Sequence, residues 1–447
     1  MVKILSETKS ICPVCLKTIY AVRVLRDGKI YLEKECAQHG FFRVLIWEGE
    51  QEFLDWKNTE SNSKPEIFDT EVQSGCPHDC GLCPKHQQQA CCVLIEVTNR
   101  CNQNCPYCFA ESEEDREGDL TPSEIKKIYR SLLNRSKDRP FNIQLSGGEP
   151  TVRDDLPYII NMGKNLGFPY IQLNTNGVRL AEEEAYCREL KQVGLSSVFL
   201  QFDGTNDEIY EKIRGQKILN VKTKAIENLT KVGLSIVLVV TVVPGINDSN
   251  VGEIIKFAAE GMPYIRGIHF QPVSYFGRFP KEPKDEDRIT LQQLIHLIEK
   301  QTNGQMKREQ FIPLSTGHSF CSFHGRFVVM EDGSYHPISA KPEAACCEKT
   351  AIIKARDYIK KQWEWQKTTN ENINKNNKLS QQYDFSEWDK YIERIKDYGM
   401  SITAMGFQDC WNLDLERLQK CRVHVAVKSG KLIPFCAYNN IYRSKGE

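Results

Sequence analysis

Short apolar runs alternate with amphipathic stretches of helical length between residues 91 and 303. Six of the apolar runs are rich in β-branched residues and bounded by Gly, Pro or Asn, which is typical of buried parallel strands. They cover 92–97, 142–146, 170–174, 197–202, 235–243 and 265–273. The helical stretches cover 122–136, 154–166, 181–193, 222–232, 249–260 and 290–301. Six such β/α units predict an α/β fold, either a partial barrel or an open doubly wound sheet, with working residues at the carboxyl ends of the strands.

The regions on either side of this repeat have different patterns of apolar, polar and charged residues. Residues 1–50 alternate apolar and polar positions around Asp27-Gly28, which predicts a small β-rich unit with a turn there. The charged stretch Lys354–Lys390 predicts surface helix and loop, and two β-like runs near the C-terminus, 422–427 and 431–439, predict a hairpin. We therefore expect four parts: 1–70 as an N-terminal domain and linker, 71–92 as a cysteine-rich segment, 93–303 as the barrel, and 304–447 as a C-terminal domain.

Composition narrows the choice of function. Lys+Arg and Asp+Glu both total 59 in the 447 residues, so no net field attracts nucleic acid. No apolar run approaches the ~18 residues of a membrane span, and the first residues lack the apolar core of a secretory signal. We expect a cytoplasmic protein that at most touches a membrane surface. In a reducing compartment, its 18 cysteines indicate metal ligation or catalysis rather than disulfides.

The most informative cysteines directly follow the first strand of the repeat. Cys101, Cys105 and Cys108 place three thiols on one loop. Three thiolates suit three irons of a four-iron cubane and leave the fourth iron open to a chelating ligand, whereas a zinc knuckle completed from elsewhere is the alternative. The next strand ends in the segment 146–150, SGGEP, where glycines expose the backbone to a ligand and a carboxylate is available for an ammonium group.

With these motifs the sequence resembles the radical S-adenosylmethionine (SAM) superfamily. The resemblance rests on the CX3CX2C loop with Tyr107 before its last cysteine, on GGEP, and on the β/α repeat of residues 93–303. It implies a partial (β/α)6 TIM-like barrel in which Cys101, Cys105 and Cys108 hold a 4Fe-4S cluster that binds SAM. An electron from a low-potential donor such as a flavodoxin or ferredoxin would then cleave SAM to a 5′-deoxyadenosyl radical, which abstracts hydrogen from the substrate.

The same resemblance implies roles for residues at the strand ends. Gly147, Gly148 and Glu149 would receive the methionine ammonium group, and Arg214 would bind its carboxylate. The other positions expected to contact SAM or substrate are Tyr107, Asn174, Asn176, Gln201, Asp203 and Gln271. From the residues alone, 174–177 also fits an ordinary turn and Arg214 fits a solvated helix end.

The remaining cysteines predict further metal sites. Cys76, Cys80, Cys83 and Cys91 supply the four thiolates of an auxiliary cluster, used for electron transfer or for structure. Two N-terminal pairs, Cys12 with Cys15 and Cys36 with His39, fit one mononuclear zinc or iron site of the zinc-ribbon or rubredoxin type. For a second auxiliary cluster we select Cys321, Cys421 and Cys436, completed by Cys346, Cys347 or Cys410; ordinary buried thiols are the alternative.

Over nearly its whole length the sequence resembles the tetraether lipid synthase subfamily, on its CPVC knuckle, its GCPHDCGLCPKHQQQAC run and its terminal WNLDLERLQKC segment. This implies an enzyme that forms carbon–carbon bonds between sp3 carbons of a lipid or another long apolar chain. We expect a monomer that acts on a small-molecule or lipid substrate. A radical SAM C-methylase or peptide-modifying enzyme with auxiliary clusters is the enzymatic alternative. A zinc-and-cysteine scaffold without catalysis would explain the N-terminal knuckle but not GGEP.

Overall fold

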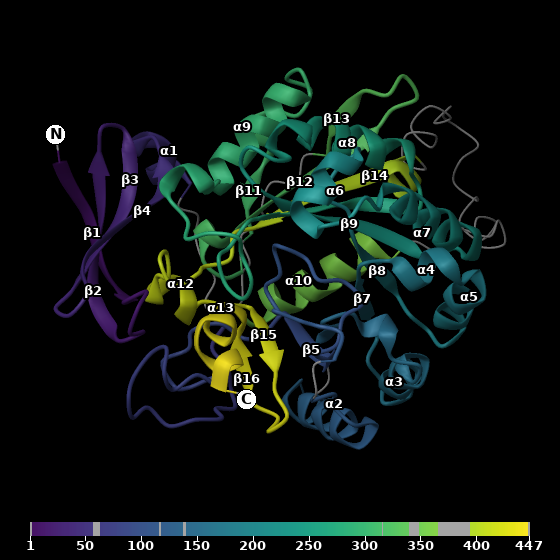
Figure 1. Cartoon of the computed structure of the whole chain (residues 1–447), viewed down its shortest axis with the longest axis horizontal. Helices are drawn as coiled ribbons and strands as arrows, with labels where there is room; N and C mark the ends of the chain where they lie inside the picture. The colour runs from purple at the N-terminus through teal and green to yellow at the C-terminus, as the bar shows by residue number, and fades with distance from the viewer. Residues whose placement is uncertain are drawn as a thin grey trace, which may run out of the picture.

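The N-terminal unit is an antiparallel sheet that projects from the side of the molecule (Figure 1). The structure is a computed structural model that describes residues 2–56, 63–115, 118–136, 140–314, 316–338, 348–364 and 394–445. The sheet has the strand order β1 (Val2–Ile11), β2 (Thr18–Arg26), β3 (Lys29–Cys36) and β4 (Gly40–Glu48), and α1 (Glu50–Asp55) follows it. The predicted turn is confirmed: Asp27 and Gly28 join β2 to β3 with φ of 50° and 79°.

Six parallel strands form the central sheet, and they lie side by side in chain order. They are β5 (Cys92–Thr98), β6 (Asn142–Gly147), β7 (Ile171–Thr175), β8 (Ser197–Gln201), β9 (Ser235–Val242) and β10 (Ile265–Pro272). Each coincides with a predicted run to within one residue at either end. The connecting helices are α2 (Pro122–Ser136), α3 (Leu156–Asn165), α4 (Val178–Glu182), α5 (Glu184–Gln192), α6 (Asp207–Arg214), α7 (Leu219–Val232), α8 (Val251–Glu260) and α9 (Leu291–Gln301). The mixed α/β fold of the radical SAM type is confirmed.

Segments from the C-terminal part widen this sheet at both edges, which the sequence pattern did not predict. β14 (Gly399–Met405) runs parallel to β10, and β15 (Val423–Ala426) runs parallel to β5. Beyond β14 lie β12 (Ser322–Val329), β11 (Ile312–Pro313) and β13 (Tyr335–Pro337), and beyond β15 lies β16 (Leu432–Pro434). The predicted hairpin is confirmed as β15–β16; α12 (Leu415–Gln419) and α13 (Phe435–Ala437) flank it. The domain boundary expected at 303/304 stays a prediction.

Helix α10 (Glu348–Trp363) includes the first part of the predicted surface helix and loop, with Lys354, Asp357 and Lys361 exposed. Of the stretch predicted as surface helix and loop, residues 354–364 are described, and they pack against strands of the barrel. The Trp363 ring meets Phe199 of β8 edge-to-face with centroids 4.7 Å apart, and the Asn142 amide donates to the Arg356 carbonyl over 3.2 Å. Lys360 and Lys361 on the same helix gave it the composition of a surface segment. Among the described helices, none has the length and apolar character needed to cross a membrane.

Candidate functional site

The three-cysteine loop follows β5 and is held in place by residues that are distant in sequence. The Cys108 N–H donates to the Arg278 carbonyl over 3.0 Å, and the Arg278 N–H donates back over 2.8 Å. The Arg278 guanidinium also donates to the Cys105 carbonyl over 3.2 Å. Arg278 belongs to the loop after β10, and sequence reasoning missed it because nothing in a single sequence connects these two loops.

Gly147 and Gly148 allow β6 to end against the start of this loop. The Gly148 N–H donates to the Thr98 carbonyl over 2.9 Å. A Cβ on Gly147 would lie 2.1 Å from the Thr98 oxygen, and one on Gly148 would lie 2.1 Å from the Arg100 oxygen. Both glycines line the central cavity, as expected. Glycine is needed at both positions because each backbone passes so close to a neighbouring segment of the chain that no side chain would fit.

The Glu149 carboxylate faces inward and connects the ends of β6 and β7. It is 1% exposed and accepts hydrogen bonds from the hydroxyls of Thr151 and Thr175 over 2.6 and 2.7 Å, and from the Asn176 N–H over 2.6 Å. Burial raises its pKa, and these hydrogen bonds oppose that shift. Its role toward the SAM ammonium group stays a prediction; in the structure, the carboxylate positions the strand ends.

Asp203 and Arg214 form a buried bidentate ion pair, with Nε–Oδ2 and Nη2–Oδ1 distances of 2.7 and 2.9 Å. Arg214 also donates to the Tyr107 carbonyl over 3.1 Å, so it supports the cysteine loop as well as lining the cavity. Sequence reasoning missed Lys222, a fully buried neighbour whose ammonium donates to Gln201 Oε1 over 3.2 Å. Burial lowers the pKa of Lys222 to about 8.

A cavity of about 800 Å³ connects the cysteine loop to α10. Most of the residues predicted for the SAM site meet in its wall: Cys101, Cys105, Tyr107, Cys108, Gly147, Gly148, Glu149, Asn174, Asn176, Gln201, Arg214 and Gln271. Asp203 is not among the lining residues and lies behind Arg214. Three thiols on one loop, opening into a space of this size, fit a cubane with one open iron and a bound SAM beside it.

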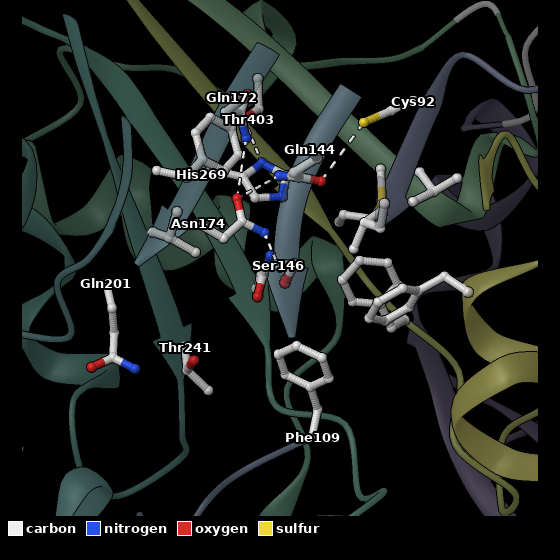
Figure 2. Close-up of a pocket in the computed structure, with 18 of the residues that line it drawn as sticks. Cys92, Phe109, Gln144, Ser146, Gln172, Asn174, Gln201, Thr241, His269 and Thr403 are labelled. Atoms are coloured by element: carbon white, nitrogen blue, oxygen red, sulfur yellow. Dashed lines mark hydrogen bonds between the residues drawn. The ribbon is translucent and has the colours of Figure 1, made fainter. Parts of the chain in front are cut away.

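Neutral polar side chains lie in a row on the wall of this cavity (Figure 2). Asn174 Oδ1 accepts from the amides of Gln144 and Gln172 over 2.8 and 3.3 Å. His269 Nδ1 lies 2.8 Å from the Thr403 hydroxyl, and burial lowers the pKa of His269 to about 4, so its ring is neutral. Apart from Asn174, sequence reasoning missed these residues, although Gln144 and Gln172 give the same signal as Gln271, a polar residue within an apolar strand.

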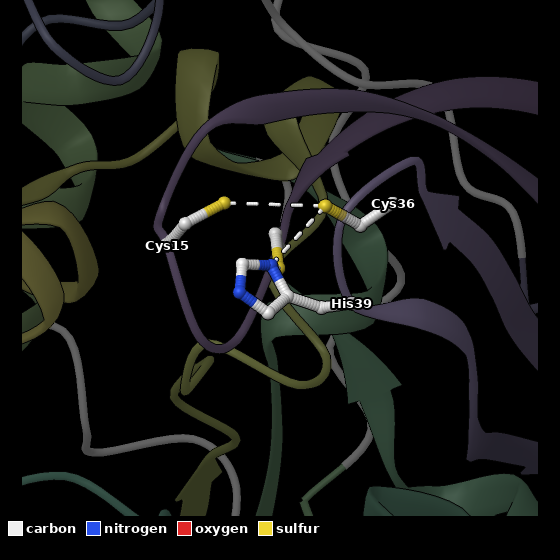
Figure 3. Close-up of side chains that lie close together, drawn as sticks. Cys15, Cys36 and His39 are labelled. Carbon is white, nitrogen blue, oxygen red and sulfur yellow. Dashed lines mark hydrogen bonds between the residues drawn. The ribbon is translucent and has the colours of Figure 1, made fainter.

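The N-terminal knuckle brings together all four of its predicted ligands (Figure 3). The ligand atoms of Cys12, Cys15, Cys36 and His39 lie within 4.8 Å of one another. Cys15 and Cys36 sulfurs are 4.0 Å apart, and His39 Nδ1 is 3.5 Å from the sulfurs of Cys12 and Cys36. Hydrogen bonds from the Gln38 backbone and from His39 lower the pKa of Cys36 to about 6. This donor set fits one tetrahedral zinc or iron ion.

The upstream cysteines gather around a smaller hollow lined by Cys76, Cys80 and Cys83. A hydrogen bond with Cys76 and burial raise the pKa of Cys80 well above its ordinary value, and the nearby sulfur of Cys421 adds to the shift. Cys91, the predicted fourth ligand, lies instead in the wall of the central cavity. The Cys421 sulfur therefore acts electrostatically on this group, and the cluster itself stays a prediction.

Cys321, Cys421 and Cys436 lie near one another in the C-terminal part, as selected from the sequence. Burial raises the pKa of Cys436, and the neighbouring sulfurs of Cys421 and Cys321 add to that effect. The Gln408 N–H points at the Cys436 sulfur over 3.3 Å. Of the residues proposed to complete this group, Cys410 is described and is half-buried, whereas Cys346 and Cys347 lie outside the described residues.

Comparison with known proteins agrees with this geometry. Residues 95–258 match the radical SAM superfamily, and residues 4–48 match the HMPTM N-terminal zinc ribbon domain. The chain is 36% identical to 7,8-dihydro-6-hydroxymethylpterin dimethyltransferase of Methanocaldococcus jannaschii, over 99% of this chain and 94% of that protein.

More distant relatives match only parts of the chain. A probable GTP 3′,8-cyclase of Pyrococcus abyssi is 36% identical over 38% of the chain and 53% of its own length. Among solved structures, Streptococcus suis SuiB bound to its precursor peptide SuiA aligns with a TM-score of 0.41 at 17% identity, over 50% of this chain and 48% of that one. The chain belongs to the radical SAM superfamily, within the family that contains the Methanocaldococcus dimethyltransferase.

Proposed function

We propose that this radical SAM enzyme is a C-methyltransferase that acts on a reduced pterin such as 7,8-dihydro-6-hydroxymethylpterin. The observation that carries the proposal is the neutral row of amides, hydroxyls and imidazole in the cavity wall. A pterin ring presents uncharged N–H donors with ring nitrogen and carbonyl acceptors at its edge, and side-chain amides can bond to both kinds of group. The similarity to the Methanocaldococcus 7,8-dihydro-6-hydroxymethylpterin dimethyltransferase, which extends over 99% of this chain, supports the same substrate class.

Aromatic side chains border the row and supply surfaces on which a flat ring can stack. Phe199 and Trp363 contact each other edge-to-face in the cavity wall. The ring centroids of His269 and Phe199 are 5.8 Å apart. Stacking with offset or edge-to-face geometry stabilises such contacts by about 1 kcal/mol each beyond the area that they bury. Together the amides would orient the ring edge, and the aromatic rings would hold its faces.

The residues at the other end of the cavity would hold the cofactors. Cys101, Cys105 and Cys108 would ligate the SAM-binding cluster, and the backbone at Gly148 would lie beside the methionine group. When bound, the cluster and SAM supply a 5′-deoxyadenosyl radical that removes a hydrogen atom from carbon. The chain contributes orientation and the exclusion of water, because the space between these residues and α10 is enclosed largely by apolar and neutral polar side chains.

A direct assay tests this function. Reconstituted protein is incubated anaerobically with a low-potential reductant, 7,8-dihydro-6-hydroxymethylpterin and excess SAM, which serves both as the radical source and, in further molecules, as the methyl donor. The pterin is then analysed by mass spectrometry. We expect the mass to rise by one or two methyl-for-hydrogen replacements, together with formation of 5′-deoxyadenosine. Cys105→Ala should abolish both products, and an unmodified pterin in the presence of 5′-deoxyadenosine formation would refute the proposed substrate.

One feature of the cavity favours a second candidate, the coupling of sp3 carbons on a long apolar chain. The wall nearest β15 and α13 is apolar and is formed by Leu94, Phe109, Phe276, Phe407, Val423 and Phe435. Such a surface would accommodate a hydrocarbon tail as well as a ring. Expression in a host followed by comparative lipid analysis distinguishes the two: coupled lipid tails favour this candidate, and unchanged lipids with a methylated pterin favour the first.

A further inference from the structure

Arg422 places a buried positive charge at the end of the cavity opposite the cysteine loop. It precedes β15, whose first residue, Val423, pairs with Cys92 at the start of β5. The cysteine loop leaves the other end of β5, and a seven-residue strand spans about 20 Å at roughly 3.3 Å per residue. Arg422 and the cysteine loop therefore lie at opposite ends of the same space.

The Arg422 guanidinium has no carboxylate partner among the described residues. The residue is 9% exposed and donates to two neutral hydroxyls, those of Thr316 and Ser322, over 2.9 and 3.2 Å. A guanidinium carries five N–H donors, so these two contacts leave most of its hydrogen-bonding capacity directed elsewhere. A buried cation without an anion is costly, and a bound anion would offset that cost.

The charges around the cavity favour an anion as well. Among the described lining residues the only carboxylate is Glu149, which lies at the end with the cysteine loop and is engaged by its own hydrogen bonds. The wall beside Arg422 contains the apolar residues Pro313 and Leu314, which strengthen electrostatic attraction by excluding water. Burial, with Arg422 as a further cause, lowers the pKa of His324 to about 4, consistent with a positive potential there.

We propose that Arg422 binds a phosphate group of the substrate, so that the substrate spans the cavity with its phosphate at Arg422 and its reacting carbon near the cysteine loop. Only the placement of the reacting carbon rests on the proposed function; the phosphate site is argued from Arg422 alone. A phosphate ester of the reduced pterin and the phosphate headgroup of a polar lipid share this chemistry. The planar fork of arginine suits two phosphate oxygens at once.

Equilibrium binding to the reconstituted protein tests the proposal with two matched pairs of ligands. The first pair is 7,8-dihydro-6-hydroxymethylpterin and its phosphate ester; the second is dodecanol and dodecyl phosphate. We expect the phosphate member of at least one pair to bind about tenfold tighter or more, because charge-assisted hydrogen bonds are the stronger class. The pair that shows the preference identifies the source of the phosphate.

Arg422→Gln should remove this preference while leaving the affinity for the uncharged member unchanged, because Gln retains a donor for Thr316. Arg326→Gln, on β12 and outside the cavity lining, is the control and should keep the preference. Equal binding within both pairs by the wild-type protein overturns the proposal. It is also overturned if Arg422→Gln keeps the preference. The same holds if that change alters only the iron content, which would mean that Arg422 serves the thiols of Cys91 and Cys92, on which its charge acts.

A second measurement does not depend on how the variant folds. Phenylglyoxal modification of wild-type Arg422, mapped by peptide mass spectrometry, should be slowed by the phosphate ligand and not by its uncharged partner. Equal modification with both ligands contradicts the proposal. A protein that methylates neither the pterin nor its phosphate ester but shows phosphate protection at Arg422 would refute the proposed function and leave the anion site standing.

Discussion

Arg23 of the N-terminal sheet and Asp414 near the C-terminus form a buried ion pair. Two guanidinium nitrogens, Nε and Nη2, donate to one carboxylate oxygen of Asp414 over 2.9 and 2.6 Å, and both side chains are less than one-tenth exposed. The other oxygen of Asp414 accepts from the Thr8 hydroxyl over 2.8 Å. The N-terminal sheet is thereby attached to the segment that leads into α12 and the β15–β16 hairpin.

Removing one member of this pair should weaken the attachment strongly. Arg23→Met leaves the Asp414 charge buried with fewer partners, and we expect a loss of about 3–5 kcal/mol in the free energy of unfolding. Urea unfolding followed by circular dichroism measures it. Arg26→Met is the control on the same strand, because its pair with Glu33 is more exposed on the arginine side and should contribute much less to stability. Equal losses in both variants would contradict a special role for the Arg23–Asp414 pair.

The glycines of GGEP give a test of how the cysteine loop is positioned. Gly148→Ala would place a Cβ 2.1 Å from the Arg100 oxygen, so the backbone that enters the loop must move. We expect 5′-deoxyadenosine formation from SAM to fall about 100-fold, the order expected when reacting groups shift by about 1 Å. Gly406→Ala is the control, since its nearest neighbouring atom would lie at an ordinary 3.4 Å. Unchanged activity in Gly148→Ala would show that the loop tolerates the movement.

Metal removal should affect the N-terminal unit selectively. Cys36→Ser removes one of four converging ligands, and we expect metal analysis to show the loss of one equivalent of zinc or iron with the cluster iron retained. The β-sheet of residues 2–48 should then become sensitive to protease, because a closed four-ligand site contributes directly to folding. Cys187→Ala, which removes a buried thiol outside every cysteine group described above, should change neither result.

The sequence predicted those parts of the fold that depend on local pattern. Each central strand is buried and therefore mostly apolar. Thr121 caps the start of α2, because the Glu124 N–H donates to its hydroxyl over 3.3 Å and its own N–H donates to the Glu124 carboxylate over 2.8 Å. The pattern could not predict β14 and β15 at the sheet edges, because strand pairing across hundreds of residues leaves no local signal. The same holds for Cys421, which lies beside Cys80, and for Arg278, which holds the cysteine loop through contacts made only in the folded chain.

The neutral state of His269 predicts a specific pH dependence. Burial lowers its folded-state pKa to about 4 from an ordinary 6.5, so the unfolded chain binds this proton more readily than the folded one. Stability from this residue is therefore complete above about pH 6.5 and is lost as the pH falls toward 4; at pH 5 the loss is about 2 kcal/mol. His269→Gln should show a smaller drop in melting temperature between about pH 7.5 and about pH 5 than wild type, whereas His296→Gln, at an exposed position, should match wild type. If wild type and His269→Gln lose stability equally, the imidazole already accepts a proton in the folded protein, and it would then present a cation rather than a neutral acceptor to the substrate ring.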